Sequence, residues 1–325
     1  MTACRLLPFV LLLAIVASSG TARADERLGW HGERMPEGLR KSEIEGRYLW
    51  SRDGSEMVYV PAGAFVMGSA DEGIEAVADG DGFEIQRDER PRHSVWLSGF
   101  YLDVHETSWE QWKRSGMPWS DRIGDRRVRP AAPDWGIVDD HPVLDVTWQA
   151  AREYLDTVGK RLPTEAEWEK AARGTDGRRF PWGDGLPEPD VHAVWKETPI
   201  AQESTAPVTC CAAGASPYGV LNLAGNVYEW VLDVYDPRFY ARSPTRDPAC
   251  IEPLCDEGGE EGQDDGTAGD VRRVLRGGAY VLEIEDLRAA LRWRLPARDR
   301  APYIGFRGAL SGVDAGPFNA PSEAP

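Results

Sequence analysis

Residues 175–310 constrain the fold most, because this stretch has little helical periodicity. Glycine, proline and tryptophan divide it into short apolar runs, and the whole chain of 325 residues contains 34 Gly, 24 Pro and 13 Trp. Such a pattern is typical of short strands and long loops held together by buried aromatic side chains. It argues against a helical bundle.

Three short helices are predicted from N-cap residues that precede apolar positions at helical spacing. They follow Thr107, Thr147 and Thr164, and glycines end them at Gly116, Gly159 and Gly174. Glu110 and Glu167 stand three residues after the first and third caps, which completes the pattern of a capping box.

Strands are predicted mainly near the start of the chain. Asp53-Gly54 separates two β-favouring runs, 48–50 and 57–60, and this arrangement indicates a hairpin. Runs 95–97 and 100–102 are further strand candidates. With the helices, they predict that residues 48–310 form one loop-rich α+β domain.

Residues 1–24 have the features of a secretory signal peptide. An apolar stretch (6–16) precedes an Ala-x-Ala cleavage site that ends at Ala24. The stretch is short for a membrane span, although an uncleaved anchor is the alternative. We therefore predict a secreted or periplasmic protein with no transmembrane anchor after cleavage. Residues 25–47 are expected to form a linker or arm, and residues 311–325 a disordered tail.

The charge balance limits the partners of the chain. Its 37 Lys and Arg against 54 Asp and Glu give a net charge of −17. This argues against a nucleic-acid binder, which needs a basic face for phosphates, and against docking on anionic lipid.

Four cysteines follow the predicted leader: Cys210, Cys211, Cys250 and Cys255. An even number in an exported protein indicates disulfides. A bond between the neighbours Cys210 and Cys211 would need a strained eight-membered ring, so we expect crosslinks from this pair to Cys250 and Cys255. A thiolate metal site at Cys250-x4-Cys255 is the alternative.

Several blocks of the chain together resemble the formylglycine-generating enzyme, or sulfatase-modifying factor, family. No single block is decisive, but together they are highly specific; two of them are Gly159-Lys-Arg-Leu-Pro-Thr-Glu-Ala-Glu-Trp168 and Asn222-Leu-Ala-Gly-Asn-Val-Tyr-Glu-Trp230. The other blocks, in the same order along the chain, are Met57–Gly68, Pro91 with His93, Phe100–Asp103, His141–Val143, Val146–Trp148, Pro181–Gly183, Tyr218–Gly219, Arg276–Gly278 and Gly305–Arg307.

The resemblance implies a single-domain variant of the C-type-lectin-like fold with little regular structure. It does not by itself imply one function. Some members of the family oxidise a cysteine to formylglycine with copper and oxygen. Others are sulfoxide synthases with iron ligands in an additional helical domain, periplasmic maturation factors or binding proteins.

The copper motif of the family is altered in this chain. A formylglycine generator resembles Gly-Gly-Ser-aromatic-x-Cys-x4-Cys, in which two thiolates hold Cu(I). The matching positions after Gly277-Gly278 are Ala279, Leu282 and Leu287. Leucine can neither ligate copper nor carry redox chemistry, so the resemblance implies a member without this copper site. A copper site moved to Cys250 and Cys255 is the alternative.

A calcium site is implied by the Asn-x-x-Gly-Asn-x-x-Glu-Trp block. In the family this block holds Ca²⁺ through hard oxygen ligands, and the matching positions are Asn222, Gly225, Val227 and Glu229. The alternative is a tight turn with buried polar groups. A second calcium site of the family is doubtful, because its asparagine aligns near Ala193.

The remaining polar candidates have structural interpretations. We expect His93 and His141 to be structural, and Glu165 and Glu167 to serve a helix start. The C-terminal arginines are expected to pair with the carboxylates of the protein, and an anion-binding groove is the alternative. Four tryptophans could stack sugars or peptides, although a core role is more common: Trp109, Trp112, Trp119 and Trp135.

Two functional hypotheses follow from these residues. The first is an exported binding or accessory module that uses the lectin-like groove for a peptide, a glycan or an envelope protein. The second is an enzyme of the same fold with altered oxidative chemistry. The altered copper motif favours the first.

Overall fold

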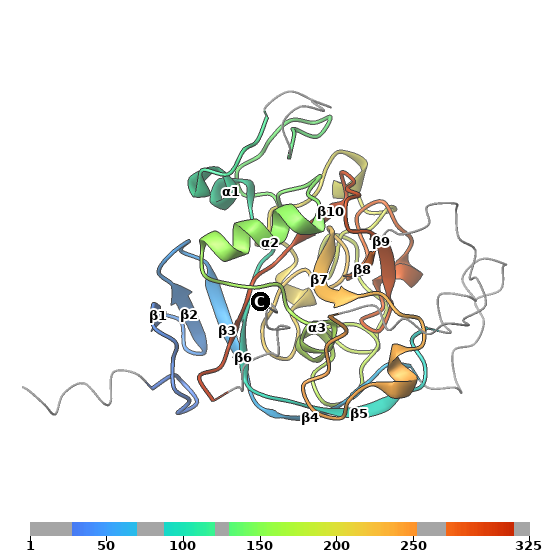
Figure 1. Cartoon of the computed structure of the whole chain (residues 1–325). Coiled ribbons are helices and arrows are strands. Elements are labelled where there is room, and N and C mark those ends of the chain that lie inside the picture. The colour runs from blue at the N-terminus through green and yellow to red at the C-terminus, as the bar shows by residue number, and fades with distance from the viewer. Residues whose placement is uncertain (1–27, 70–87, 121–129, 252–270, 315–325) are drawn as a thin grey trace, which may run out of the picture.

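The predicted hairpin forms the middle of the first sheet in the computed structural model, which describes residues 28–69, 88–120, 130–251 and 271–314. This antiparallel five-stranded sheet has the order β1-β2-β3-β6-β11. Its strands are β1 (Leu39–Lys41), β2 (Arg47–Trp50), β3 (Glu56–Val60), β6 (Phe100–Asp103) and β11 (Ala309–Ser311). The last described strand therefore returns to the N-terminal sheet, which lies at the left of Figure 1.

A second sheet carries the C-terminal half of the domain. It has the order β10-β7-β8-β9, and β10 runs parallel to β7 while the other pairs are antiparallel. Its strands are β7 (Tyr228–Val234), β8 (Arg272–Arg276), β9 (Trp293–Pro296) and β10 (Ile304–Phe306). A separate antiparallel pair is formed by β4 (Gly63–Met67) and β5 (His93–Leu97).

The three predicted helices are present as α1 (Trp109–Ser115), α2 (Trp148–Thr157) and α3 (Glu165–Arg173). The caps at Thr147 and Thr164 are confirmed, as is the box closed by Glu167. The cap of α1 is Ser108 with Gln111, one residue later than predicted. The reason is that tertiary hydrogen bonds already fix the backbone of Thr107. Its N–H donates to the carbonyl of Phe306, and its carbonyl accepts from the N–H of Val143.

Short 3₁₀ turns supply most of the remaining regular structure in the described loops. They are Ile200–Gln202, Ala212–Gly214, Phe239–Arg242 and Ile284–Leu287. This distribution confirms the predicted loop-rich α+β architecture. Among the described residues, no helix has both the length and the apolar character that a bilayer crossing requires.

Part of the segment expected to be a linker packs against the first sheet. Strand β1 pairs with β2, and Leu39 is buried beside Trp50 and Tyr48. The indole of Trp30 donates to the carbonyl of Arg47 over 2.8 Å. The described part of the arm, from residue 28, is thus an ordered edge of the domain.

Helix α3 lies at the centre of the domain, and all nine of its residues are buried. Figure 1 places it between the β4–β5 pair and strands β7 and β8. A helix buried all round needs partners for its charged side chains. Two of those partners are Arg276, at the end of β8, and Arg292, just before β9.

Candidate functional site

The segment that aligns with the copper motif leaves β8 after Arg276. Gly277 and Gly278 have φ of 98° and 72°, which favours glycine, and a Cβ on Gly278 would lie 2.7 Å from the carbonyl oxygen of Asp286. The carbonyl of Gly277 accepts from Gly225 N–H over 2.7 Å, and Tyr280 N–H donates to the carbonyl of Asn226 over 2.9 Å. Backbone contacts therefore fix this segment against the turn before β7.

The three altered positions of the motif are apolar and belong to two clusters of the core, and we call them the apolar floor. Ala279 and Leu287 are fully buried, and Leu282 is half-buried. Leu287 packs in a cluster with Phe180, Trp195 and other apolar side chains. These three residues provide no donor for a soft metal ion, so the copper pair of the family does not fit at these positions.

A second, partly exposed apolar cluster includes Tyr280 of the same segment, and we call it the Tyr280 face. Its buried members are Val194, Ala206, Cys211 and Tyr280, and its half-exposed members are Trp135, Ile200, Ala201, Cys210 and Tyr303. The rings of Trp135 and Tyr280 meet edge to face with centroids 5.7 Å apart. Burial, with Asp134 and Tyr303 nearby, raises the pKa of Tyr280 to about 12, so its hydroxyl is neutral at pH 7.

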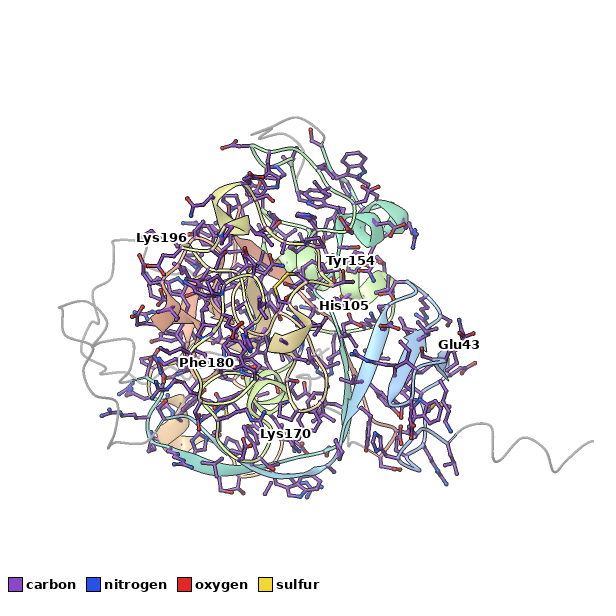
Figure 2. The ribbon with its side chains drawn as sticks, turned by 180° about the vertical axis from the view of Figure 1, so that it is seen from behind. Glu43, His105, Tyr154, Lys170, Phe180 and Lys196 are labelled. Carbon is purple, nitrogen blue, oxygen red and sulfur yellow. A yellow bond between two sulfur atoms is a disulfide. The ribbon has the colours of Figure 1, made fainter. Side chains whose placement is uncertain are left out.

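The face lies on the side of the molecule away from the first sheet. Lys196 N–H donates to the carbonyl of Leu282 over 2.9 Å, which places Lys196 next to the floor. Figure 2 shows Lys196 at the outer edge of the molecule and Glu43 at the opposite edge. The side chain of Lys196 forms an ion pair with Glu283 at the rim.

The cysteine pairing differs from the prediction. The structure joins Cys210 to Cys211 rather than either of them to Cys250, and Cys255 lies outside the described residues. The local backbone gives the reason, because Cys211 has φ of 62° and opens the short turn 212–214. Cys250 is buried beneath β7 with its N–H on Asp233, in a different part of the core.

A buried network of ion pairs precedes the floor in the chain, at Arg276; arginine–carboxylate pairs were expected from the sequence, but Glu165 was assigned only to a helix start. Arg276 donates to Glu165 over 3.1 Å and to Glu169 over 2.7 Å, and all three side chains are at most 1% exposed. Arg292 adds a contact of 2.7 Å to Glu165. Burial raises the pKa of Glu169, but the charges of Arg276 and Arg173 outweigh burial, and the net shift is downward.

The predicted calcium residues lie in one turn that leads into β7. Asn222 and Gly225 have φ of 55° and 80°. The Oδ1 of Asn222 and the carbonyl oxygens of Gly225 and Val227 accept no hydrogen bond from any residue in the described ranges. Oxygen ligands of this kind suit Ca²⁺, so the donor set fits the ion.

Glu229, the fourth residue of that set, already has protein partners. Its carboxylate accepts from Arg307 over 2.6 and 2.7 Å and from the indole of Trp168 over 2.8 Å. Glu229 and Arg307 are completely buried. Within the described chain, no three His, Cys, Asp or Glu side chains are grouped as a metal site, so calcium here would depend mainly on amide and carbonyl oxygens.

A separate cavity of about 320 Å³ is lined in part by Glu106, whose carboxylate contacts the turn before β7. Its acidic lining residues are Asp53, Glu56, Glu106 and Glu110. The side-chain amides of Asn222 and Asn226 donate to Glu106 over 2.9 Å each. Burial raises the pKa of Glu106 to about 7 and lowers that of His105 to about 4. The cavity thus contains an uncharged imidazole and a carboxyl that titrates near neutrality.

Most of the other candidates contact neighbouring residues of the protein. Arg288, Arg292 and Arg307 form ion pairs with buried carboxylates, as expected, and His141 contacts the Thr205 hydroxyl over 3.0 Å. Trp109 and Trp112 belong to the core, whereas Trp119 is 37% exposed beside Lys113. Of the four tryptophans considered, only Trp135 lies in the Tyr280 face.

The comparisons with known proteins agree with this architecture. The model of the sulfatase-modifying factor enzyme 1-like domain matches residues 49–311. A formylglycine-generating enzyme of Streptomyces coelicolor is 34% identical over 272 residues, which covers 69% of this chain and 78% of that enzyme. The serine/threonine-protein kinase pkn1 of Chlamydia caviae is 34% identical over 282 residues, or 82% of this chain. The chain spans only about two fifths of that kinase, 39% of its length.

A solved structure shows the same fold. PvdO from Pseudomonas aeruginosa matches with a TM-score of 0.63 and 24% identity, over 83% of this chain and the whole of that chain. At this level of identity the likeness concerns the fold alone.

Proposed function

Because the chain belongs to the sulfatase-modifying factor enzyme 1-like domain family, we propose that it is a binding or accessory member that does not generate formylglycine. The observation that carries this proposal is the apolar floor. Leu287 is fully buried where a copper-binding thiolate would stand, and Ala279 replaces the motif serine. A two-thiolate copper centre cannot form from these side chains.

The ligand class proposed is a peptide segment, from a partner in the envelope, that presents an apolar or aromatic side chain. The Tyr280 face supports this choice, because three half-exposed or buried aromatic rings gather there: Trp135, Tyr280 and Tyr303. Partly exposed aromatic side chains around an apolar floor are common where proteins bind peptides. A glycan that stacks on the same rings is the competing ligand.

One experiment tests the loss of chemistry. The copper-loaded protein is incubated with a Cys-x-Pro-x-Arg peptide, oxygen and a reductant, and the aldehyde is sought by mass spectrometry. We expect no product above a metal-only control. Turnover that disappears in Cys250→Ser or Cys255→Ser would refute the proposal and show that the copper site had moved to those residues.

A second experiment tests binding. The protein is used to select from a display library of random peptides, with Trp135→Ala as the test variant and Trp119→Ala as the control. We expect enrichment of apolar or aromatic peptides by the wild type and by Trp119→Ala but not by Trp135→Ala. No enrichment by the wild type, or equal enrichment by Trp135→Ala, would contradict peptide binding at this face.

Calcium and export belong to the same proposal. The oxygens of Asn222, Gly225 and Val227 would hold the ion, and Glu229 would join them only by giving up part of its pairing with Arg307. The ion would supply a fixed charge that stabilises the turn before β7. Cleavage after Ala24 would release the domain into an extracytoplasmic compartment. Residues 1–27 lie outside the described structure. The intact mass of the secreted protein tests the export step, because cleavage after Ala24 gives a chain that begins at Asp25.

The alternative function is an enzyme with different oxidative chemistry. The specific observation in its favour is the Cys210–Cys211 disulfide, which lies in the Tyr280 face.

A further inference from the structure

We propose that the Cys210–Cys211 disulfide is a redox-active pair that accepts two electrons from thiols at the Tyr280 face. The exchange goes beyond the proposed binding function and does not depend on it. Only the preference for thiols carried on apolar peptides rests on that function.

The first argument is that this disulfide is not a structural crosslink. Its two residues are adjacent, with Cα atoms 3.8 Å apart. In the chain-entropy model a disulfide stabilises a protein by closing a loop, and the effect grows with the number of residues enclosed. A bond between neighbours encloses none, so it cannot constrain the unfolded chain in the way that the predicted crosslinks of about 40 residues would.

The second argument is access. Thiol–disulfide exchange needs a path for the attacking sulfur. Cys210 is half-exposed, whereas Cys211 is 8% exposed and belongs to the buried part of the face. An incoming thiolate therefore reaches the sulfur of Cys210 first. The two sulfurs thus differ in access. The sulfur of Cys210 is the one attacked, and Cys211 is the leaving group.

The third argument is that the reduced pair has a partner. The Sγ of Cys211 lies 3.6 Å from the carbonyl oxygen of Asp190. That distance suits a weak hydrogen bond from a thiol, and a disulfide sulfur has no hydrogen to donate. After reduction the Cys211 thiol can donate to this carbonyl. The site can therefore accommodate both oxidation states without moving the strands of either sheet.

The chemistry balances as follows. A substrate thiolate attacks Sγ of Cys210, the Cys210–Cys211 bond breaks, and Cys211 leaves as a thiolate that takes a proton from solvent. A second substrate thiolate then attacks the substrate sulfur of the mixed disulfide and releases Cys210. The products are a substrate disulfide and the reduced cysteine pair. A small-molecule disulfide, such as oxidised glutathione, reoxidises the pair by the reverse exchange.

The surroundings separate this pair from Cys250. Burial, with Asp233 and Asp236 nearby, raises the pKa of the Cys250 thiol to about 12, which disfavours the reactive thiolate. Cys250 is also 3% exposed. Cys250→Ser is therefore the matched control, because it removes one cysteine of the chain without altering the Tyr280 face.

The test uses the full secreted chain in its native state with glutathione as the probe. The protein is equilibrated in buffers of increasing reduced-to-oxidised glutathione ratio, alkylated without denaturant, digested and mapped by mass spectrometry. We expect two alkylated cysteines, Cys210 and Cys211, to appear together while the circular dichroism and melting temperature stay unchanged. Cys250→Ser should behave in the same way.

Trapping variants test the direction of attack. Oxidised glutathione should form a mixed disulfide with Cys210 in Cys211→Ser at least tenfold faster than with Cys211 in Cys210→Ser, because Cys210 is the exposed sulfur. Equal rates would overturn the assignment of the attacked residue. The double variant Cys210→Ser/Cys211→Ser should form no adduct and should melt within a few degrees of the wild type.

Three results would refute the inference. These are a native disulfide map that joins Cys210 or Cys211 to Cys250 or Cys255, a pair that is reduced only when the protein unfolds, and a double variant that loses the fold. Peptide selection by the face is measured separately. Exchange that fails while peptides still bind would therefore remove only this inference and leave the proposed function intact.

Discussion

Replacement of Arg307 by methionine should be among the most damaging single changes in the chain. Its guanidinium donates to both oxygens of Glu229 and to the carbonyl oxygens of Asp103, Val104 and Leu221, over 2.6 to 3.1 Å. Both charged side chains are completely buried. Arg307→Met leaves the carboxylate of Glu229 in the core with Trp168 as its remaining donor.

The magnitude follows from these contacts. Breaking a buried ion pair by removing one partner costs about 3–5 kcal/mol, because the other charge stays uncompensated. The carbonyl of Val104 still accepts from the N–H of Leu221, so at most two carbonyls are orphaned, and each adds about 1 kcal/mol. The expected loss is then about 5–7 kcal/mol, comparable to the roughly 5–15 kcal/mol that stabilises a typical domain. Glu229→Gln should cost less, because the three carbonyl oxygens still accept from Arg307.

Urea unfolding followed by tryptophan fluorescence, with EDTA present throughout, measures these free energies. The double variant Glu229→Gln/Arg307→Met should be less unstable than the sum of the single changes, since it removes both buried charges. Arg300→Met is the control, because its 3.7 Å pair with Asp145 is partly exposed and should contribute at most about 1 kcal/mol. A loss below about 1 kcal/mol in Arg307→Met, or strictly additive variants, would refute the reasoning.

Three further predictions test other parts of the site. Burial raises the pKa of Asp88 to about 6, so its stabilising contribution is present below its unfolded pKa of about 4 and is lost as pH rises through 6. Between pH 4 and pH 7, the free energy of unfolding of Asp88→Asn should therefore rise relative to that of the wild type by up to about 3 kcal/mol. Parallel curves of stability against pH would contradict this. Millimolar calcium should raise the melting temperature of the wild type but not of Asn222→Gly, which removes the Oδ1 ligand at a position whose φ of 55° glycine tolerates, and no response to calcium or EDTA in the wild type would remove calcium from the proposal. Leu287→Ala should cost about 2–5 kcal/mol in urea unfolding and Leu282→Ala clearly less, because only the first is fully buried; equal costs would mean that the floor is not packed as described.

The local elements could be predicted from the sequence because local rules determine them. Asp53-Gly54 between two apolar runs gave the correct hairpin, and the side chains of Thr147 and Thr164 cap α2 and α3. The cap of α1 was displaced by one residue because a tertiary contact holds Thr107. Sequence patterns contain no information about such a contact.

The site could be predicted only where side-chain identity decides the chemistry. The leucines of the altered motif were identified by comparison with the family pattern, and the structure shows Leu287 fully buried and Leu282 half-buried. The cysteine pairing was wrong because ring strain was judged from covalent geometry alone. The backbone at Cys211 has φ of 62°, and a positive φ at a cysteine cannot be read from the sequence.

The ion pairs of Arg276 and Arg292 show why the scaffold does not depend on the copper motif. Glu165 was assigned to a helix start, yet its carboxylate binds Arg276 and Arg292 from two segments more than 100 residues away. These contacts, with the backbone bonds of Gly277 and Tyr280, hold the segment whatever side chains follow. The backbone of this segment is therefore fixed independently of the side chains at 279, 282 and 287, although the buried Leu287 is still expected to contribute to stability. Under the proposed function, this chain has an apolar floor in place of the copper motif, and the Tyr280 face binds a different ligand.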